Sequence, residues 1–254
     1  MGKIIAFANQ KGGIGKTTSA INIAAALSQR GKSVLAVDCD PQGNMTSGFG
    51  VNKKNLRLTT YDLLVGRGLF DDAVIKTKFG ELSLLPANIS LAGAEFEMVE
   101  LDDRSFRLKN ELEKIRDRYD YIVIDCPPSL GLLTINALAA SDGVVIPMQC
   151  EYFALEGLTQ LMLTIRKVRE LYNPALEITG ILITMYNGRL NLSTQVLREL
   201  KKYYANQLFT EPIPRSVRIS EAPSYGMPIC YYDKNSKGAQ AYDQVAKELL
   251  VRIG

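Results

Sequence analysis

The fold of this chain is decided by the stretch Asn9-Gln10-Lys11-Gly12-Gly13-Ile14-Gly15-Lys16-Thr17-Thr18. The stretch follows the apolar run Lys3–Ala8, which is typical of a buried strand, and leads into an alanine-rich amphipathic segment that predicts a helix. A glycine-rich loop that ends in Gly-Lys-Thr between a strand and a helix predicts a polyphosphate-binding loop. Its backbone N–H groups would surround the phosphates, and the positive end of the helix would face them.

Short apolar runs alternate with helical patterns along nearly the whole chain, and several runs are apolar on both faces, as buried parallel strands are. This alternation predicts an α/β fold with a doubly wound, mostly parallel sheet flanked by helices, that is, a P-loop NTPase. We expect one domain over residues 1–254, with short helices in the irregular part Gly50–Ala94. The expected strands are Lys3–Ala8, Ser33–Asp38, Leu82–Pro86, Tyr121–Asp125, Gly143–Pro147 and Ile178–Thr184. The expected helices are Lys16–Arg30, Arg104–Arg118, Leu130–Ala139, Leu155–Leu171, Asn191–Tyr204 and Ala239–Ile253.

The composition excludes several classes of function. The 254 residues contain no histidine, which rules out histidine acid–base chemistry and histidine metal sites. The four cysteines are widely spaced and form no CxxC pair, as in a reduced cytoplasmic protein. No apolar run approaches the ~18 residues that cross a membrane, and the chain enters its first strand without a signal-peptide pattern. The net charge of +3 is too small by itself to predict nucleic-acid binding.

The loop residues suggest their own roles. The glycines Gly12, Gly13 and Gly15 would let the backbone approach phosphate closely. Lys16 is the expected contact of the β- and γ-phosphates, and the hydroxyl of Thr17 is placed for Mg²⁺. A plain glycine-rich turn is the competing interpretation, and Gly-Lys-Thr in this context disfavours it.

Two further strands end in carboxylates. The segment Val34-Leu35-Ala36-Val37-Asp38-Cys39-Asp40-Pro41 carries Asp38 and Asp40, and the run Tyr121–Asp125 ends in Asp125. Ligands of doubly wound sheets bind at the carboxyl ends of the strands, so all three aspartates should lie beside the phosphates. The first pair would hold Mg²⁺ through water and orient an attacking water, and Asp125 suits the carboxylate that supports Mg²⁺ in NTPases. Ordinary turns at the strand ends are the alternative.

Lys11 departs from the usual loop pattern, which has glycine at the position of Gln10 and no second lysine. Two ammonium groups at one triphosphate repel each other unless they serve separate oxygens. Lys11 would therefore point outward and reach the phosphates of a second subunit, as an arginine finger does. A solvated surface lysine is the alternative.

These motifs resemble a known family. The run Lys11–Thr18 is similar to the deviant phosphate loop of the ParA/MinD/Soj group, which includes the nitrogenase iron protein. Further motifs, spread over the whole chain, are similar to those of the ParA/Soj partitioning ATPases. These are Asp38-Cys39-Asp40-Pro41-Gln42-Gly43-Asn44, Ile124-Asp125-Cys126-Pro127-Pro128-Ser129-Leu130, Gln149-Cys150-Glu151, Ile213-Pro214-Arg215 and Glu221-Ala222-Pro223.

The resemblance implies an Mg²⁺-dependent ATPase that binds ATP and ADP and dimerises as an ATP sandwich. Lys11 would cross to the other subunit, Asp40 would position the hydrolytic water, and Asp125 would support Mg²⁺. The nucleotide would contact Lys11, Gly12, Gly13, Ile14, Gly15, Lys16, Thr17 and Thr18, with Met185, Pro214 and Ser216 at the adenine. Metal contacts would come from Thr17, Asp38 and Asp125. Family members often have asparagine at the position of Ser216.

The family also implies a role on DNA. Its ATP dimers bind double-stranded DNA without sequence preference, and a ParB/Spo0J-like partner stimulates hydrolysis. From Asn187 to Arg218 this chain has six basic and two acidic residues, a charge of +4 against +3 for the whole chain. The resemblance places Arg189 and Arg218 on the DNA face, and it implies a cytoplasmic, nucleoid-associated protein. A solvated basic helix face is the alternative.

Three other functions compete with partitioning. A MinD-like cell-division ATPase would end in a basic amphipathic membrane helix, whereas Ala239–Ile253 has mixed charges and the spacing of a core helix. An iron–sulfur ATPase would need cysteines at a shared face, and Cys39 and Cys126 are better explained as small core residues. A module that binds nucleotide without turnover is disfavoured by Lys16, Asp40 and Asp125. We expect no membrane association.

Overall fold

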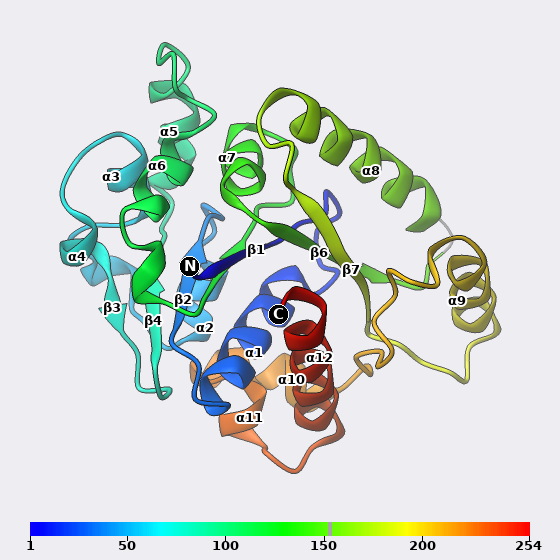
Figure 1. Ribbon diagram of the computed structural model, residues 1–254. Helices are drawn as coiled ribbons and strands as arrows, with labels where there is room; N and C mark the ends of the chain where they lie inside the picture. Colours follow the sequence, from blue (N-terminus) through cyan, green and yellow to red (C-terminus); the bar gives the residue numbers. More distant parts are fainter. Residues whose placement is uncertain (152–153) are drawn as a thin grey trace.

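A seven-stranded sheet forms the centre of the molecule (Figure 1). The computed structural model describes residues 1–151 and 154–254. The strand order is β3-β4-β2-β5-β1-β6-β7, and the paired strands are parallel except for β3, which is antiparallel to β4. The strands are β1 (Lys3–Phe7), β2 (Val34–Asp38), β3 (Ile75–Lys76), β4 (Leu82–Leu85), β5 (Tyr121–Asp125), β6 (Gly143–Gln149) and β7 (Glu177–Thr184).

Helices cover both faces of the sheet, with α7 and α8 on one side and α1 and α12 on the other (Figure 1). The longer helices are α1 (Lys16–Gln29), α5 (Leu91–Glu97), α6 (Arg107–Glu113), α7 (Leu132–Ala140), α8 (Ala154–Leu171), α9 (Asn191–Tyr204) and α12 (Lys237–Ile253). Shorter α-helical turns are α2 (Asn44–Gly48), α3 (Thr60–Leu64), α4 (Phe70–Ala73), α10 (Val217–Glu221) and α11 (Ile229–Tyr232). Single 3₁₀ turns are η1 (Lys53–Asn55), η2 (Arg116–Arg118) and η3 (Ala222–Tyr225).

Alternation along β1 explains why the sheet needs helices on both faces. Ile4 and Ala6 pack in one buried cluster, and Ile5 and Phe7 pack in the other. A strand that is apolar on both sides is stable only when both sides are covered, which is the parallel α/β arrangement. The doubly wound sheet expected from the sequence is therefore confirmed, and each expected strand is present within two residues of its bounds.

One expected helix is shorter than predicted. The segment Arg104–Arg118 forms α6, which begins at Arg107, and a separate turn η2. Asn136 of α7 receives a hydrogen bond from the amide of Leu108 and donates to the carbonyl of Arg104, so tertiary contacts replace the first helical turn. At the carboxyl end of the expected helix, the side chain of Arg116 in η2 donates a hydrogen bond to the carbonyl of Gly2.

Short elements account for the other differences. The expected irregular part Gly50–Ala94 does contain short helices, α3 and α4, and it also contains the two-residue strand β3, which the sequence did not predict. The turns α10, η3 and α11 between α9 and α12 were missed as well. The helices α2 and α5 were not predicted either. Elements of two to seven residues carry too little periodicity to be recognised in a sequence.

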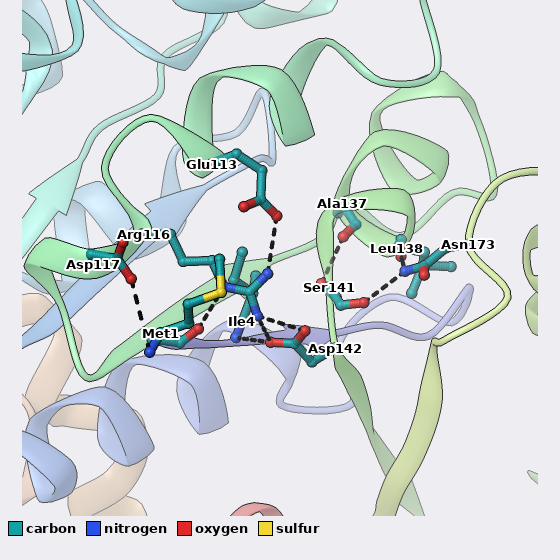
Figure 2. A network of polar contacts seen from close by, with 11 residues as sticks. Met1, Ile4, Glu113, Arg116, Asp117, Ala137, Leu138, Ser141, Asp142 and Asn173 are labelled. Carbon is teal, nitrogen blue, oxygen red and sulfur yellow. Dashed lines mark hydrogen bonds and ion pairs between the residues drawn. The ribbon is translucent and has the colours of Figure 1, made fainter.

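A polar network fastens the end of the sheet that lies away from the phosphate loop (Figure 2). Arg116 donates to the two carboxylate oxygens of Asp142 at 2.7 and 2.5 Å and to Glu113 at 3.0 Å. Asp142 also accepts the amide of Ile4 at 2.8 Å. The network ties β1, η2 and the turn before β6 together.

Candidate nucleotide site

The loop between β1 and α1 has the backbone of an anion-binding site. Gly15 is the N-cap residue of α1, with φ 87°, in the left-handed region that favours glycine. No side chain caps the helix there, so its first amides are available to a ligand. A helix N-terminus with open amides and a positive dipole is suited to phosphate.

Lys16 is held inside the loop. Its side chain is buried and its Nζ donates to the carbonyl of Lys11 at 3.2 Å. Burial lowers the pKa of Lys16, and the nearby charges of Asp125 and Asp40 raise it in part. The ammonium group thus lies against the backbone of the phosphate loop and near Asp125 and Asp40.

Asp38 and Asp125 are direct neighbours in the sheet, paired across β2 and β5 at their carboxyl ends. Both are fully buried. Asp38 is well satisfied: one oxygen accepts the amide of Asp40, and the other accepts the amide of Thr46 at 2.8 Å and its hydroxyl at 2.7 Å. Burial raises the pKa of Asp38 to about 6, and the hydrogen bonds of Thr46 oppose the rise.

Asp125 has no such support. Neither carboxylate oxygen has a hydrogen-bond partner among the described residues. Burial, and then the charge of Asp38, raise the pKa of Asp125 well above its usual value. The hydroxyl of Thr17 lies close enough to lower that pKa, but its geometry falls short of a hydrogen bond. An orphaned buried carboxylate of this kind is what a bound cation would satisfy.

Asp40 is presented by a tight turn between β2 and α2. The carboxylate is buried and accepts the amide of Gln42 at 2.9 Å. Gly43 follows with φ 60°, and a Cβ atom there would lie 2.6 Å from the carbonyl oxygen of Ala87. Glycine is therefore required at this position, and the Asp-Pro-Gln-Gly motif fixes the direction of Asp40.

The cleft above the loop consists of two joined cavities. The first, of about 540 Å³, is lined by Gly12, Gly13, Gly15, Lys16, Thr17, Thr18, Asp40 and Met185 among others. The second, of about 330 Å³, is lined by Thr184, Met185, Pro214 and Ser216 among others. Both share Gly15, Thr18, Met185 and Pro223, so the two cavities form one cleft that extends from the phosphate loop to Pro214 and Ser216.

Met185 lies where the two cavities meet. Its φ of 49° is positive, a conformation that costs a non-glycine residue about 1 kcal/mol or more. Just before it, the hydroxyl of Thr184 bonds the carbonyls of Ile14 and Met148, which ties the phosphate loop to β6 and β7. The strained backbone thus lies at the junction between the two cavities.

Several expected residues do not line the cleft. Ile14 is buried behind the loop, and Asp38 and Asp125 lie beneath it. Lys11 is exposed, as expected for a residue that acts outside its own subunit, but its ammonium group is ion-paired with Glu151.

The two arginines expected on DNA differ from each other. Arg189 is exposed, and it forms no ion pair among the described residues. Arg218 is engaged by Glu221 at 3.5 Å and Asp233 at 3.6 Å, and it lies over the ring of Tyr232.

Sequence reasoning missed some of the site. The cleft is also lined by Gln42, Asn44, Ser47, Pro128, Pro223 and Ser224, and Thr46 and Thr184 support it from below. Four of these residues, Gln42, Asn44, Thr46 and Ser47, follow Asp40 directly, so the motif around Asp40 already indicated this part of the cleft. Glu151 lies in a motif that the sequence singled out without giving it a role.

Mg²⁺ fits this donor set. The described residues hold no group of three or more His, Cys, Asp or Glu side chains arranged as a complete metal site. Mg²⁺ does not need one, since it is commonly bound by one or two carboxylates, waters and substrate phosphates. Thr17 and Asp125 are the residues beside the phosphate loop whose oxygens would hold Mg²⁺.

Comparisons with known proteins agree with this geometry. A family model described as an AAA domain matches residues 2–178. The sporulation initiation inhibitor protein Soj of Bacillus subtilis is 54% identical over 98% of this chain and 98% of its own length. The chromosome partitioning protein ParA of Caulobacter vibrioides is 48% identical over 98% of this chain and 94% of its own length. The chain belongs to the ParA/Soj family.

A solved structure extends the likeness of this ParA/Soj chain to three dimensions. The cobyrinic acid a,c-diamide synthase from Mycobacterium smegmatis is 39% identical, with a TM-score of 0.87. The match covers 98% of this chain and 95% of that one. That protein was solved with a bound ATP analogue and magnesium.

Proposed function

We propose that this chain is a Mg²⁺-dependent ATPase of the ParA/Soj type that segregates a chromosome or plasmid. The observation that carries the proposal is the orphaned carboxylate of Asp125, buried beside the phosphate loop and Lys16. A buried carboxylate without a hydrogen-bond partner is costly to the empty protein, and a bound cation would offset that cost. The names of the Soj and ParA relatives supply the biological process.

The roles of the side chains follow from their positions. Lys16 and the open amides of the loop bind the phosphates, and Thr18 adds a contact on the first turn of α1. Thr17 and Asp125 hold Mg²⁺, and Asp38 lies beside them as a buried neighbouring charge. When bound, Mg²⁺ neutralises negative charge on the transferring phosphoryl group.

Asp40 orients the water that attacks the γ-phosphate. Its carboxylate is fixed by the amide of Gln42, so it enters the reaction already aligned. At the other end of the cleft, Met185, Pro214 and Ser216 contact the adenine. The whole chain, residues 1–254, acts as one ATPase domain.

Hydrolysis takes place in a dimer that encloses two ATP molecules. Lys11, exposed at the rim of the loop, crosses to the partner subunit and stabilises charge on its transferring phosphoryl group. This arrangement couples nucleotide turnover to assembly, because neither site is complete in the monomer.

The ATP dimer binds double-stranded DNA through Arg189 and Arg218, without sequence preference. A ParB/Spo0J-like protein stimulates hydrolysis and so releases the dimer from the nucleoid. Arg189 contributes the larger share, since Arg218 shares its charge with Glu221 and Asp233. Contacts of this kind weaken steeply with salt.

A MinD-like role on the membrane is less well supported. The apolar side of α12 is buried against the core through Val245, Ala246 and Leu249 and is not free to enter a lipid surface. In the part of the chain that the structure describes, no helix is long and apolar enough to cross a membrane.

The variant Asp40→Ala tests the proposal. It should bind ATP, fail to hydrolyse it, and accumulate as a dimer that stays on DNA, as measured by sedimentation velocity and by retention on a duplex. Asp72→Ala, which removes an exposed aspartate of α4, is the matched control and should behave as the wild type. An Asp40→Ala protein that remains monomeric with ATP contradicts the proposal.

A further inference from the structure

The side chain of Lys11 is held by its own subunit. Its Nζ forms an ion pair with Oε2 of Glu151, which comes two residues after the end of β6. The two side chains are 50% and 48% exposed, so the pair lies at the surface, where a second molecule can reach it. The contact spans 140 positions of sequence, and it joins the phosphate loop to the neighbouring strand.

The backbone of Lys11 is fixed independently of this pair. Its amide donates to Oδ1 of Asn9 at 3.1 Å, and its carbonyl accepts Nζ of Lys16 at 3.2 Å. The side-chain amide of Asn9 is itself anchored to the carbonyl of Pro147 at 2.8 Å. The loop therefore keeps its shape without Glu151, and what Glu151 determines is the direction of the Lys11 side chain.

We propose that Glu151 is a positioning residue that retains Lys11 on its own subunit until the nucleotide of a second subunit replaces it. The inference rests on the proposed function. To reach the partner's phosphates, the Lys11 ammonium must leave the carboxylate that follows its own β6. Glu151 then remains beside the phosphate loop with its negative charge unpaired, which disfavours the approach of further negative charge. Both effects oppose dimerisation.

Because Glu151 holds Lys11, dimerisation requires a ligand that binds the Lys11 ammonium group more strongly than Glu151 does. A triphosphate carries more negative charge than one carboxylate and presents several oxygens, so it can displace Glu151. A diphosphate lacks the γ-phosphate that Lys11 would bind. Glu151 thus raises the threshold for dimerisation and sharpens the difference between the ATP and ADP states.

The size of the effect follows from the exposure of the pair. A surface ion pair shifts an equilibrium by about 1.4- to 5-fold. A symmetric dimer breaks two such pairs, so removing both should tighten dimerisation by about 2- to 25-fold.

The test compares Glu151→Gln with wild type by sedimentation velocity over a range of protein concentrations, with Mg²⁺ and a non-hydrolysable ATP analogue. The matched control is Glu199→Gln, which breaks an exposed Lys–Glu pair of similar exposure on α9. Glu151→Gln should dimerise about 2- to 25-fold more tightly, and Glu199→Gln should match the wild type. Glu151→Asp, which keeps the charge, should restore most of the wild-type behaviour.

Salt gives a second readout that a purely structural role would not change. Raising ionic strength from about 0.05 to about 0.5 M screens the exposed pair, so the gap between wild type and Glu151→Gln should narrow. If the wild type dimerises and Glu151→Gln dimerises equally or more weakly, the restraint by Glu151 is refuted. If the wild type itself fails to dimerise with the analogue, the proposed function fails instead.

Discussion

Replacing Asp125 by Asn should stabilise the nucleotide-free protein while removing Mg²⁺-dependent ATP hydrolysis. The carboxylate is fully buried, and neither oxygen has a partner among the described residues. Burying this carboxylate without a partner therefore lowers the stability of the nucleotide-free protein. Asn has nearly the same shape and carries no charge, so the change removes the cost and the metal ligand together.

The magnitude follows from the proton that Asp125 must take up. Protonating a carboxyl group with an ordinary pKa of 3.8 at about pH 7 costs about 4 kcal/mol, since each pKa unit is about 1.4 kcal/mol. This figure is the upper limit of the charge-related penalty, because the group can escape its buried charge by binding a proton. A neutral carboxyl and an Asn amide without partners each cost about 1–3 kcal/mol in this place, so these two costs largely cancel. The expected gain in the free energy of unfolding is therefore positive and at most about 4 kcal/mol.

The pH dependence has a definite sign. The pKa of Asp125 is raised on folding, so the folded state binds the proton more tightly than the unfolded chain does. The contribution of Asp125 to stability should therefore become more favourable as the pH falls from about 7 towards about 4, and the advantage of Asp125→Asn should shrink over the same range. The pKa of Asp38 is raised to about 6, so Asp38 also favours folding more as the pH falls, in the wild type and in the variant.

Urea denaturation in EDTA at several pH values measures these differences, and phosphate release with ATP and Mg²⁺ measures activity. Asp72→Asn, an exposed aspartate on α4, is the control and should change neither quantity. If Asp125→Asn unfolds at a lower urea concentration than wild type at neutral pH, the interpretation of Asp125 as a carboxyl group without a partner is refuted.

Three other changes address separate parts of the site. Lys16→Ala should abolish nucleotide binding in a calorimetric titration, because it removes the buried ammonium group beneath the loop. Thr46→Val should lower the free energy of unfolding by about 2–4 kcal/mol in urea, since Asp38 loses a charged hydrogen bond, whereas Thr46→Ser should retain most of it. Arg189→Glu combined with Arg218→Glu should remove DNA retention at low salt without affecting the ATP dimer, and unchanged retention would exclude this surface.

The central strands and the phosphate loop could be predicted because their signals are local. Strands β1 and β5 are continuous apolar runs, and the Gly-Lys-Thr sequence follows β1 directly. The carboxyl ends of parallel strands meet at one edge of a sheet, so the order of residues along the chain was enough to predict Asp40 and Asp125 beside the loop.

The rest depended on contacts between distant residues. Asn136 shortens the expected helix at Arg104, and no pattern near Arg104 contains that information. The hydrogen bonds of Thr46 to Asp38 and the ion pair of Lys11 with Glu151 link segments whose distance is set by the folded chain. Sequence could identify Lys11 as unusual, but it could not supply the residue that holds it.

The central claim is that Lys11 of one subunit completes the site of the other. Mixing Lys11→Ala with Asp40→Ala tests it directly, because neither variant alone should hydrolyse ATP. In a mixed dimer the Lys11→Ala subunit keeps its own Asp40 and receives Lys11 from its partner, so one of the two sites is complete. With equal mixing, half the dimers are mixed, and phosphate release should recover to about a quarter of the wild-type rate. A mixture that stays as inactive as its components would contradict the account.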